Sequence, residues 1–179
     1  IAPVRDGRKF LKRNGFHTHQ VKSCIIVGGG RAAYYLGKRL IELGITVQIV
    51  ENKKERCEEL SVLLPQAIVV NGDGTSEELL NEIGITTTES LVPLTGIDEE
   101  NIMLTLYAKE VSDAKVVTKI NRITYTGVID QLDLGSVVYP KYITSEAIIA
   151  FVRSKTATMN NNIETMIHLF DERVEAIEF

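Results

Sequence analysis

The sequence of 179 residues predicts an α/β fold, a doubly wound parallel sheet of about six strands. From Ser23 onward, short apolar runs alternate with amphipathic segments, which is the pattern of a parallel sheet covered by helices. The runs are rich in Val, Ile and Leu without polar alternation, as expected of strands buried on both faces. A glycine-rich turn joins the first run to the first amphipathic segment, which is a common strand-to-helix junction in such sheets.

The strands and helices are expected to alternate along most of the chain. Strands are predicted over residues 23–27, 46–50, 67–70, 90–94, 115–119 and 136–139. Helices are predicted over residues 31–43, 53–64, 76–83, 98–111, 123–132 and 142–155.

Glycine, proline and capping residues set the expected helix ends. Gly44 and Gly84 close the first and third helices, because glycine adopts a left-handed cap at little cost. Pro65 ends the second helix, since proline cannot continue a helical hydrogen-bond pattern. Thr75 and Glu78 have the spacing of a capping box, which places the start of the third helix beside them.

The composition argues against several classes of protein. Hydrophobic residues make up 44% and charged residues 25%, an ordinary globular balance that argues against disordered, collagen-like and coiled-coil chains. No apolar stretch approaches the roughly 20 residues that cross a bilayer, so we expect a soluble protein with no direct membrane insertion. The net charge of -4 provides no positive field for nucleic acid. Cys24 and Cys57 form neither a disulfide framework nor a metal pattern, which favours a reducing compartment.

The two ends of the chain differ from its middle. Residues 1–20 are expected to form a linker or arm, because the first 22 residues carry six of the 20 basic residues and few large apolar ones. A boundary is expected near residue 140, with a polar connector over residues 156–162. The chain begins with Ile1, and residues 174–179 alternate apolar and acidic like a strand without an evident partner. We therefore expect a piece of a longer chain.

The first strand is followed by the dinucleotide fingerprint GxGxxG/A. In this motif Gly28 permits the tight turn, Gly30 lets the backbone approach a pyrophosphate, and the small Ala33 lets helix and strand pack closely. Gly29 and Ala32 complete the predicted binding turn. The motif therefore predicts a Rossmann-like fold, and the alternative is a glycine turn that serves conformation alone and binds nothing.

Glu51 ends the second strand about 20 residues after the turn, where a carboxylate can accept hydrogen bonds from ribose hydroxyls. The same acid would repel a 2′-phosphate, so NAD, ADP or ATP is favoured over NADP. Asn52 follows Glu51 and is included in the predicted site. A solvated Glu51 with no ligand is the alternative.

Ligands of open parallel sheets bind beyond the carboxyl ends of the strands, so the residues that follow the later strands are also candidates. Asp73 either contacts adenine or ribose, or is a turn residue that bonds its own backbone. Lys119 either lies near phosphates or is a snorkelling surface lysine. Thr95 and Gly96 either contact the ligand or form a plain loop. The full set of these candidates is Gly72, Asp73, Gly74, Thr95, Gly96 and Lys119.

Arg31 lies in the first turn of a predicted helix, where its charge opposes the helix dipole and a bound anion would offset the cost. An exposed arginine with good helix propensity is the alternative. The histidines His17, His19 and His168 all lie outside the fingerprint region, and no catalytic set or metal site can be assembled around them. We therefore do not expect an enzyme.

Several stretches beyond the fingerprint resemble one family. They are NGDGT at 71–75, LLNEIGI at 79–85, LTGIDEENI at 94–102 and VTKIN at 117–121. Together with the glycine turn and Glu51, they resemble the RCK, or KTN, nucleotide-binding domain of potassium uptake and channel proteins, most closely the TrkA type, over residues 21–140. The family usually has Arg where Lys119 stands and Gly where Ala33 stands, and lysine offers a point charge rather than a bidentate fork.

The resemblance implies a cytoplasmic regulatory subunit that binds NAD(H) or ADP/ATP and gates the potassium-transporting membrane subunit of a Trk-type system. It also implies a homo-oligomer, either a dimer or a higher ring, that is peripheral to the inner face of the membrane. Residues 21–140 would be the RCK N-terminal domain, 141–159 a crossover helix and connector, and 160–179 the start of a truncated RCK C-terminal domain. The alternatives are an NAD-dependent oxidoreductase fragment that lacks its substrate domain, and a structural domain that binds no ligand.

The last predicted helix carries a candidate docking face for a second subunit. Ile143, Ala147, Ile148, Phe151 and Val152 fall on one side of it. Burial of this side within the same subunit is the alternative.

Overall fold

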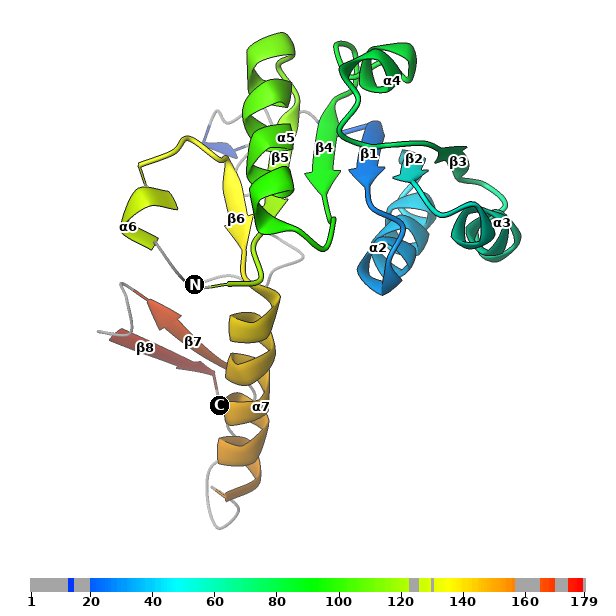
Figure 1. The fold of residues 1–179 in the computed structure, drawn as a ribbon. Helices are drawn as coiled ribbons and strands as arrows, with labels where there is room; N and C mark the ends of the chain where they lie inside the picture. The colour runs from blue at the N-terminus through cyan, green and yellow to red at the C-terminus, as the bar shows by residue number, and fades with distance from the viewer. Residues whose placement is uncertain are drawn as a thin grey trace.

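The computed structural model describes residues 13–14, 20–122, 126–129, 131–156, 165–169 and 174–178. Strands and helices alternate along most of this length (Figure 1). The strands are β1 (Ser23–Val27), β2 (Thr46–Glu51), β3 (Ile68–Asn71), β4 (Ser90–Pro93), β5 (Lys115–Lys119), β6 (Ser136–Val138), β7 (Thr165–Leu169) and β8 (Val174–Glu178). The helices are α2 (Arg31–Glu42), α3 (Lys54–Leu63), α4 (Glu77–Glu82), α5 (Asp98–Val111), α6 (Thr126–Ile129) and α7 (Pro140–Thr156).

The first six strands form one parallel sheet in the order β3-β2-β1-β4-β5-β6. This order confirms the predicted doubly wound, Rossmann-like fold. The chain winds outward from β1 to one edge and then returns to add β4 on the other side of β1. Val27 at the end of β1 is therefore in register with both Val50 of β2 and Pro93 of β4. The point where the strand order reverses lies between β1 and β4.

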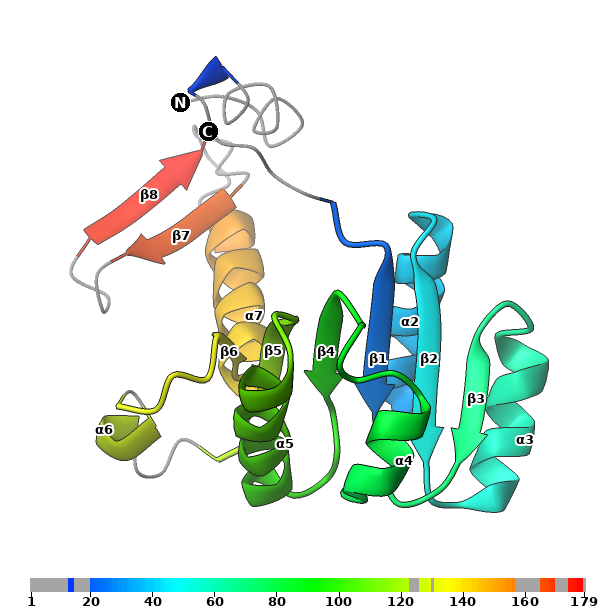
Figure 2. The ribbon, with the colours of Figure 1, turned by 90° about the horizontal axis from the view of Figure 1, so that it is seen from above.

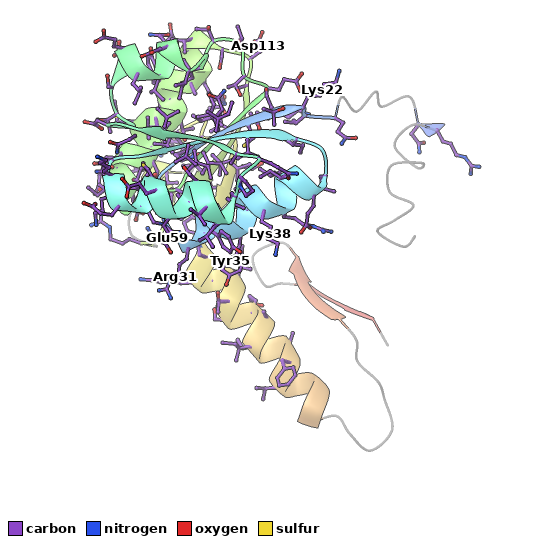
Figure 3. All side chains as sticks on the ribbon, turned by 90° about the vertical axis from the view of Figure 1, so that its right-hand side faces the viewer. Lys22, Arg31, Tyr35, Lys38, Glu59 and Asp113 are labelled. Carbon is purple, nitrogen blue, oxygen red and sulfur yellow. The ribbon has the colours of Figure 1, made fainter. Side chains whose placement is uncertain are left out.

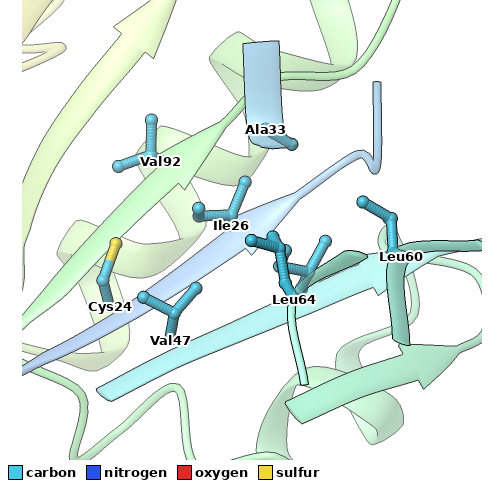
Figure 4. Packing of buried hydrophobic residues seen from close by; sticks show 8 residues of the cluster. Cys24, Ile26, Ala33, Val47, Leu60, Leu64 and Val92 are labelled. Carbon is cyan, nitrogen blue, oxygen red and sulfur yellow. The ribbon is translucent and has the colours of Figure 1, made fainter. Parts of the chain in front are cut away.

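Each face of the sheet has its own apolar core, because successive strand residues point to opposite faces. On one face, Ile26 packs with Ala33 of α2, with Leu60 of α3 and with Leu64, the C-cap of α3 (Figure 4). On the other face, neighbouring β1 residues pack with Leu80 of α4 and with α5. Figure 2 accordingly shows α4 and α5 on the near side of the sheet and α2 on the far side.

Burial of the strands on both faces, expected for all six, holds for the central strands but not for the edges. All four residues of β4 are buried, whereas Ile68 of the edge strand β3 is 53% exposed. An edge strand has a neighbour on one side only, so its outer residues remain in contact with solvent.

One predicted helix start was wrong by a residue. The N-cap of α4 is Ser76, whose hydroxyl accepts a hydrogen bond from the Leu79 N–H at 3.3 Å. The expected capping residue, Thr75, instead donates its hydroxyl to the Asp73 carboxylate at 2.8 Å. Two adjacent hydroxyl residues compete for the same role here, and the turn formed by Asp73 decides between them.

The C-terminal strand has a partner that the sequence pattern did not reveal. β8 pairs antiparallel with β7, with Ile177 opposite Met166 (Figure 2). Most of the expected arm over residues 1–20, and residues 157–162 of the expected connector, lie outside the described residues. The same holds for residues 123–125 and 130 of the expected fifth helix, of which α6 is the described part.

Helix α7 extends away from the sheet (Figure 1) and exposes apolar side chains. Ile143, Ile148 and Phe151 are 55%, 58% and 63% exposed, so the described residues do not bury this apolar side. Among the described residues, no helix has the length and hydropathy of a membrane span.

Candidate functional site

An open cavity of about 670 Å³ lies at the carboxyl ends of the strands, beside the point between β1 and β4 where the strand order reverses. This is the position at which ligands of doubly wound sheets bind. Its wall consists of Val27, Gly28, Gly29, Gly30, Val50, Glu51, Asn52, Lys53, Arg56, Asp73, Gly74, Thr75, Leu94, Thr95, Gly96, Ile97, Glu100 and Lys119.

The three consecutive glycines on this wall have different reasons for lacking a side chain. Gly28 has a φ of 101°, and a Cβ there would lie 3.0 Å from the Leu94 backbone. At Gly29 a Cβ would lie 2.8 Å from Leu60 Cδ1 and 2.9 Å from Glu51 Cβ. At Gly30 a Cβ would have no neighbour within 4 Å. The first two glycines are therefore required by the fold, whereas the space beside Gly30, which lines the cavity, is open.

The N-terminus of α2 lies at Gly30, and no acidic side chain in its first turn offsets the positive end of the helix dipole. Gly30 is the N-cap and provides no side-chain hydrogen bond, and the first turn contains no acidic residue. The first N–H groups of a helix lack partners within it, and the helix dipole makes this end positive. Such an end, beside a cavity, suits an anionic group of a ligand.

The carboxylate of Glu51 joins the end of β2 to the glycine turn. Its Oε2 accepts a hydrogen bond from the Gly29 N–H at 2.8 Å, and its Oε1 accepts one from the Lys53 N–H at 2.8 Å. A carboxylate has about four lone-pair positions, so roughly two remain for hydroxyl donors of a ligand. The acid predicted for ribose recognition therefore also supports the turn.

Arg56, in the first turn of α3, is a cavity residue that the sequence did not indicate. Its Nε donates a hydrogen bond to the Gly29 carbonyl at 2.7 Å, and its Nη1 forms an ion pair with Glu59 at 2.6 Å. Arginine within a polar helix is common, so no local signal separates Arg56 from its neighbours. Only the packing of α3 beside the glycine turn brings the guanidinium to this carbonyl.

Asp73 shows the turn geometry that was the alternative to ligand contact, although it also lines the cavity. Its Oδ1 accepts hydrogen bonds from the backbone N–H and the hydroxyl of Thr75, at 2.9 and 2.8 Å. These two bonds, the backbone one first, lower the pKa of the Asp73 carboxyl. Gly74 packs tightly beneath this turn, because a Cβ there would lie 2.3 Å from Val27 Cγ1.

Asn101 connects the ends of β4 and β5 and is fully buried. Its Oδ1 accepts from the backbone N–H and the hydroxyl of Thr95, both at 2.9 Å. Its Nδ2 donates to the Thr95 carbonyl at 3.3 Å and to the Lys119 carbonyl at 3.0 Å. One side chain therefore fixes the two cavity-lining residues Thr95 and Lys119 relative to each other.

Lys119 closes the cavity beside β4. The side chain is half-buried rather than at the open surface, and its Nζ donates to the Leu94 carbonyl at 3.2 Å. Burial lowers the pKa of Lys119, and the Asp98 carboxylate acts in the opposite direction. The ammonium group of Lys119 therefore lies on the cavity wall, beside the end of β4.

Asp98 anchors the start of α5 to the segment after β5, although it does not line the cavity. Its carboxylate accepts hydrogen bonds from the Asn121 backbone and side chain and from the Arg122 N–H, each at 2.9 Å. Burial by itself would raise the pKa of this carboxyl, but these hydrogen bonds together outweigh it and lower the pKa.

Four of the predicted site residues do not form the cavity wall. Arg31 and Ala32 are exposed, and Figure 3 shows the Arg31 side chain projecting away from the sheet. Ala33 is fully buried against β1 and β2, which is the close packing expected of it. A Cβ on Gly72 would lie 2.6 Å from Leu79 Cδ2, so this glycine serves the packing of α4. The cavity contains all the other predicted residues and adds Val27, Val50, Lys53, Arg56, Thr75, Leu94, Ile97 and Glu100.

The strand order, the glycine turn and the cavity at the switch point define a Rossmann-type domain. The family model of the TrkA-N domain matches residues 24–140, so the chain belongs to the TrkA-N family. The Trk system potassium uptake protein TrkA of Haemophilus influenzae is 33% identical over 156 residues, which cover 87% of this chain and 33% of the relative. The protein of the same name from Halomonas elongata is 31% identical over 177 residues, 99% of this chain and 38% of the relative. The chain thus spans about a third of the length of these curated relatives.

Solved structures share the fold at low sequence identity. The TrkA-N domain of the Escherichia coli inner membrane protein ybaL has a TM-score of 0.66 at 17% identity, covering 75% of this chain and 99% of that one. The GsuK channel bound to NAD has a TM-score of 0.58 at 14% identity, covering 92% of this chain and 29% of that one. These likenesses support the fold.

Proposed function

We propose that this chain is the nucleotide-sensing part of a regulatory subunit of a Trk-type potassium transport system, and that its cavity binds NAD(H) or ADP/ATP without turnover. The observation that carries this proposal is the cavity at the switch point of the sheet. There the open space at Gly30, the positive end of α2 and the Glu51 carboxylate share one wall.

The diphosphate of the ligand lies over Gly30 and the first turn of α2 in this proposal. Residues 31–33 contribute their backbone N–H groups there, whatever the direction of their side chains. The ribose hydroxyls donate to the free lone pairs of Glu51, which would repel the 2′-phosphate of NADP. Lys119 supplies a positive charge on the cavity wall. The remaining contacts come from Asn52, Asp73, Gly74, Thr95 and Gly96.

The comparisons support the choice of ligand and system. Curated relatives at 31–33% identity are named as Trk system potassium uptake proteins, and one structural neighbour is a channel bound to NAD. By this relationship, the partner is a potassium-transporting membrane subunit, and the chain acts as a cytoplasmic protein at the inner face of the membrane.

The exposed apolar side of α7 supplies the surface through which binding is communicated. We expect it to dock on a second copy, because four apolar side chains on it, those of Ile143, Ile148, Phe151 and Val152, are more than half exposed. In this proposal residues 21–140 form the nucleotide-binding domain, 141–159 the crossover helix and connector, and 160–179 the start of a further domain. A nucleotide shifts the population of assembly states only by the difference in its affinity for them.

Titration of NAD, NADH, ADP, ATP and NADPH into the purified chain tests the ligand proposal. A ligand that binds only the folded protein raises the melting temperature as its concentration passes the dissociation constant. We expect a rise with at least one of the first four compounds and a much smaller one with NADPH. No rise with any of them would favour a structural domain without a ligand.

Two further measurements test the remaining parts of the proposal. Potassium flux through vesicles that contain the membrane partner is expected to change when the nucleotide-bound subunit is added. Reduction of NAD by the chain in the presence of alcohols, monitored at the absorbance of NADH, would instead favour the oxidoreductase fragment.

A further inference from the structure

The peptide groups on either side of Gly29 are held by two oppositely charged side chains. Glu51 accepts the Gly29 N–H at 2.8 Å, and Arg56 Nε donates to the Gly29 carbonyl at 2.7 Å. Hydrogen bonds to charged groups are among the stronger ones in proteins. The orientation of these two peptide planes is therefore set from outside the turn, by residues of β2 and α3.

The contact with Arg56 determines where the next N–H group points. The peptide between Gly29 and Gly30 is trans, so its carbonyl and its N–H point in opposite directions. Because Arg56 holds the carbonyl, the Gly30 N–H is directed away from the guanidinium. This N–H has no hydrogen-bond partner among the described residues, and Gly30 itself is exposed on the cavity wall. It is a free donor next to the positive end of α2.

Arg56 is itself firmly placed by its contacts with protein acceptors. Its side chain is only 22% exposed, and Nη1 is paired with Glu59. Nη2 makes a longer contact of 3.5 Å with the Gly30 carbonyl. All three guanidinium nitrogens thus face protein acceptors, which differs from an arginine that is free to bind a 2′-phosphate.

We propose that Arg56 is a positioning residue for nucleotide binding, which holds the Gly29–Gly30 peptide so that the Gly30 N–H donates to the ligand's diphosphate. This inference rests on the proposed function. Arginine suits the role better than lysine, because its planar fork reaches both carbonyls and Glu59 at once, whereas an ammonium group has no such fixed geometry. The carbonyls are also masked by the guanidinium, so they do not repel the phosphate oxygens.

The test compares ADP binding to the whole chain and to three variants by isothermal titration calorimetry. Arg56→Met removes the guanidinium and retains the apolar stem, while Arg56→Lys retains the charge without the fork. Arg39→Met is the matched control, because Arg39 forms an exposed ion pair with Glu42 on α2 and lies outside the cavity. We expect ADP to bind Arg56→Met about tenfold more weakly or worse, Arg56→Lys to an intermediate degree, and Arg39→Met within twofold of the parent chain.

The amide resonance of Gly30, in protein labelled with ¹⁵N-glycine, gives a readout that a general structural effect would not produce. We expect ADP to shift this resonance downfield in the parent chain, as a new hydrogen bond to phosphate requires, and much less in both Arg56 variants. If Arg56→Met does not fold, the ADP affinity and the Gly30 shift of Arg56→Lys alone test the proposal.

The outcomes separate this inference from the function on which it rests. If the parent chain binds none of the nucleotides, the proposed function fails. If the parent chain binds ADP and the Arg56 variants bind it equally well with the same Gly30 shift, the inference is overturned and the proposed function stands.

Discussion

Replacing Gly30 by Asp should separate the stability of the domain from its ability to bind a nucleotide. Gly30 is the N-cap of α2, with a φ of -66° and a ψ of -174°, and its Cβ position is free of neighbours within 4 Å. An aspartate fits this backbone, and as an N-cap it can accept a hydrogen bond from the first turn and oppose the helix dipole. We expect the free energy of unfolding to rise by about 0.5 kcal/mol, which raises the melting temperature by about 1–2 °C.

The same carboxylate lies where the diphosphate is expected. Two unit charges about 4 Å apart interact by about 4 kcal/mol at an effective dielectric constant near 20. This corresponds to a loss of affinity of roughly a thousandfold, before any steric effect of the side chain is added.

The assay is thermal unfolding of the parent chain and the variant, each with and without ADP or NAD. The parent chain should show a nucleotide-dependent rise in melting temperature, and Gly30→Asp should show none at millimolar ligand. Gly127→Asp is the matched control, since a Cβ at Gly127 also meets open space but lies in α6, away from the cavity. It should bind like the parent chain.

Retention of normal affinity by Gly30→Asp would refute the proposed pose, since a charge cannot be placed against a diphosphate without cost. If Gly30→Asp is strongly destabilised, the conclusion that the fold does not require glycine at position 30 is wrong.

Other substitutions test separate parts of the structure. Asn101→Ala leaves buried groups at the ends of β4 and β5 unpaired, so urea unfolding should show a free energy of unfolding lower by about 3 kcal/mol. Asn81→Ala is the control, because it loses one exposed hydrogen bond and should change the free energy of unfolding by less than about 0.5 kcal/mol. The lowered pKa of Asp98 means that its stabilisation is present above the unfolded-state pKa of about 3.9 and is lost as the pH falls through the folded-state value. The stability difference between the parent chain and Asp98→Asn should therefore narrow from about pH 6 to about pH 3, and a difference that is constant with pH would contradict the assigned shift. If α7 docks on a second copy as proposed, Phe151→Asp should lower the mass measured by light scattering to that of a monomer without changing the melting temperature of the monomer. Val62→Asp, at an 81% exposed site on α3, is the control and should leave the measured mass unchanged.

Sequence patterns predicted the sheet well because each strand and helix is encoded locally. Runs such as residues 23–27 and 115–119 matched the observed strands to the residue, since β-branched and aliphatic side chains are needed wherever a strand is covered by helices. Gly44 and Gly84 have φ values of 76° and 86°, as their positions at helix ends predicted. Once the strands were predicted, the residues at their carboxyl ends, which line the cavity, could be predicted as well.

Two details of the fold, the N-cap of α4 and the exposure of β3, could not be predicted from the local sequence. Thr75 and Ser76 both suit an N-cap, and only the carboxylate of Asp73 in its folded turn assigns the role to Ser76. The exposure of Ile68 depends on β3 lying at the edge of the sheet, which its own residues do not specify.

By itself the amino-acid sequence determined the alternation of strands and helices, the glycine turn and the acid at the end of β2. Tertiary structure alone decided that Arg56 donates a hydrogen bond to the Gly29 carbonyl and that Asn101 forms hydrogen bonds with both Thr95 and Lys119. The physical reason is the range of the interactions. Backbone conformation and burial pattern act over a few consecutive residues, whereas these hydrogen bonds join residues 6 to 27 positions apart that meet only when the strands lie side by side.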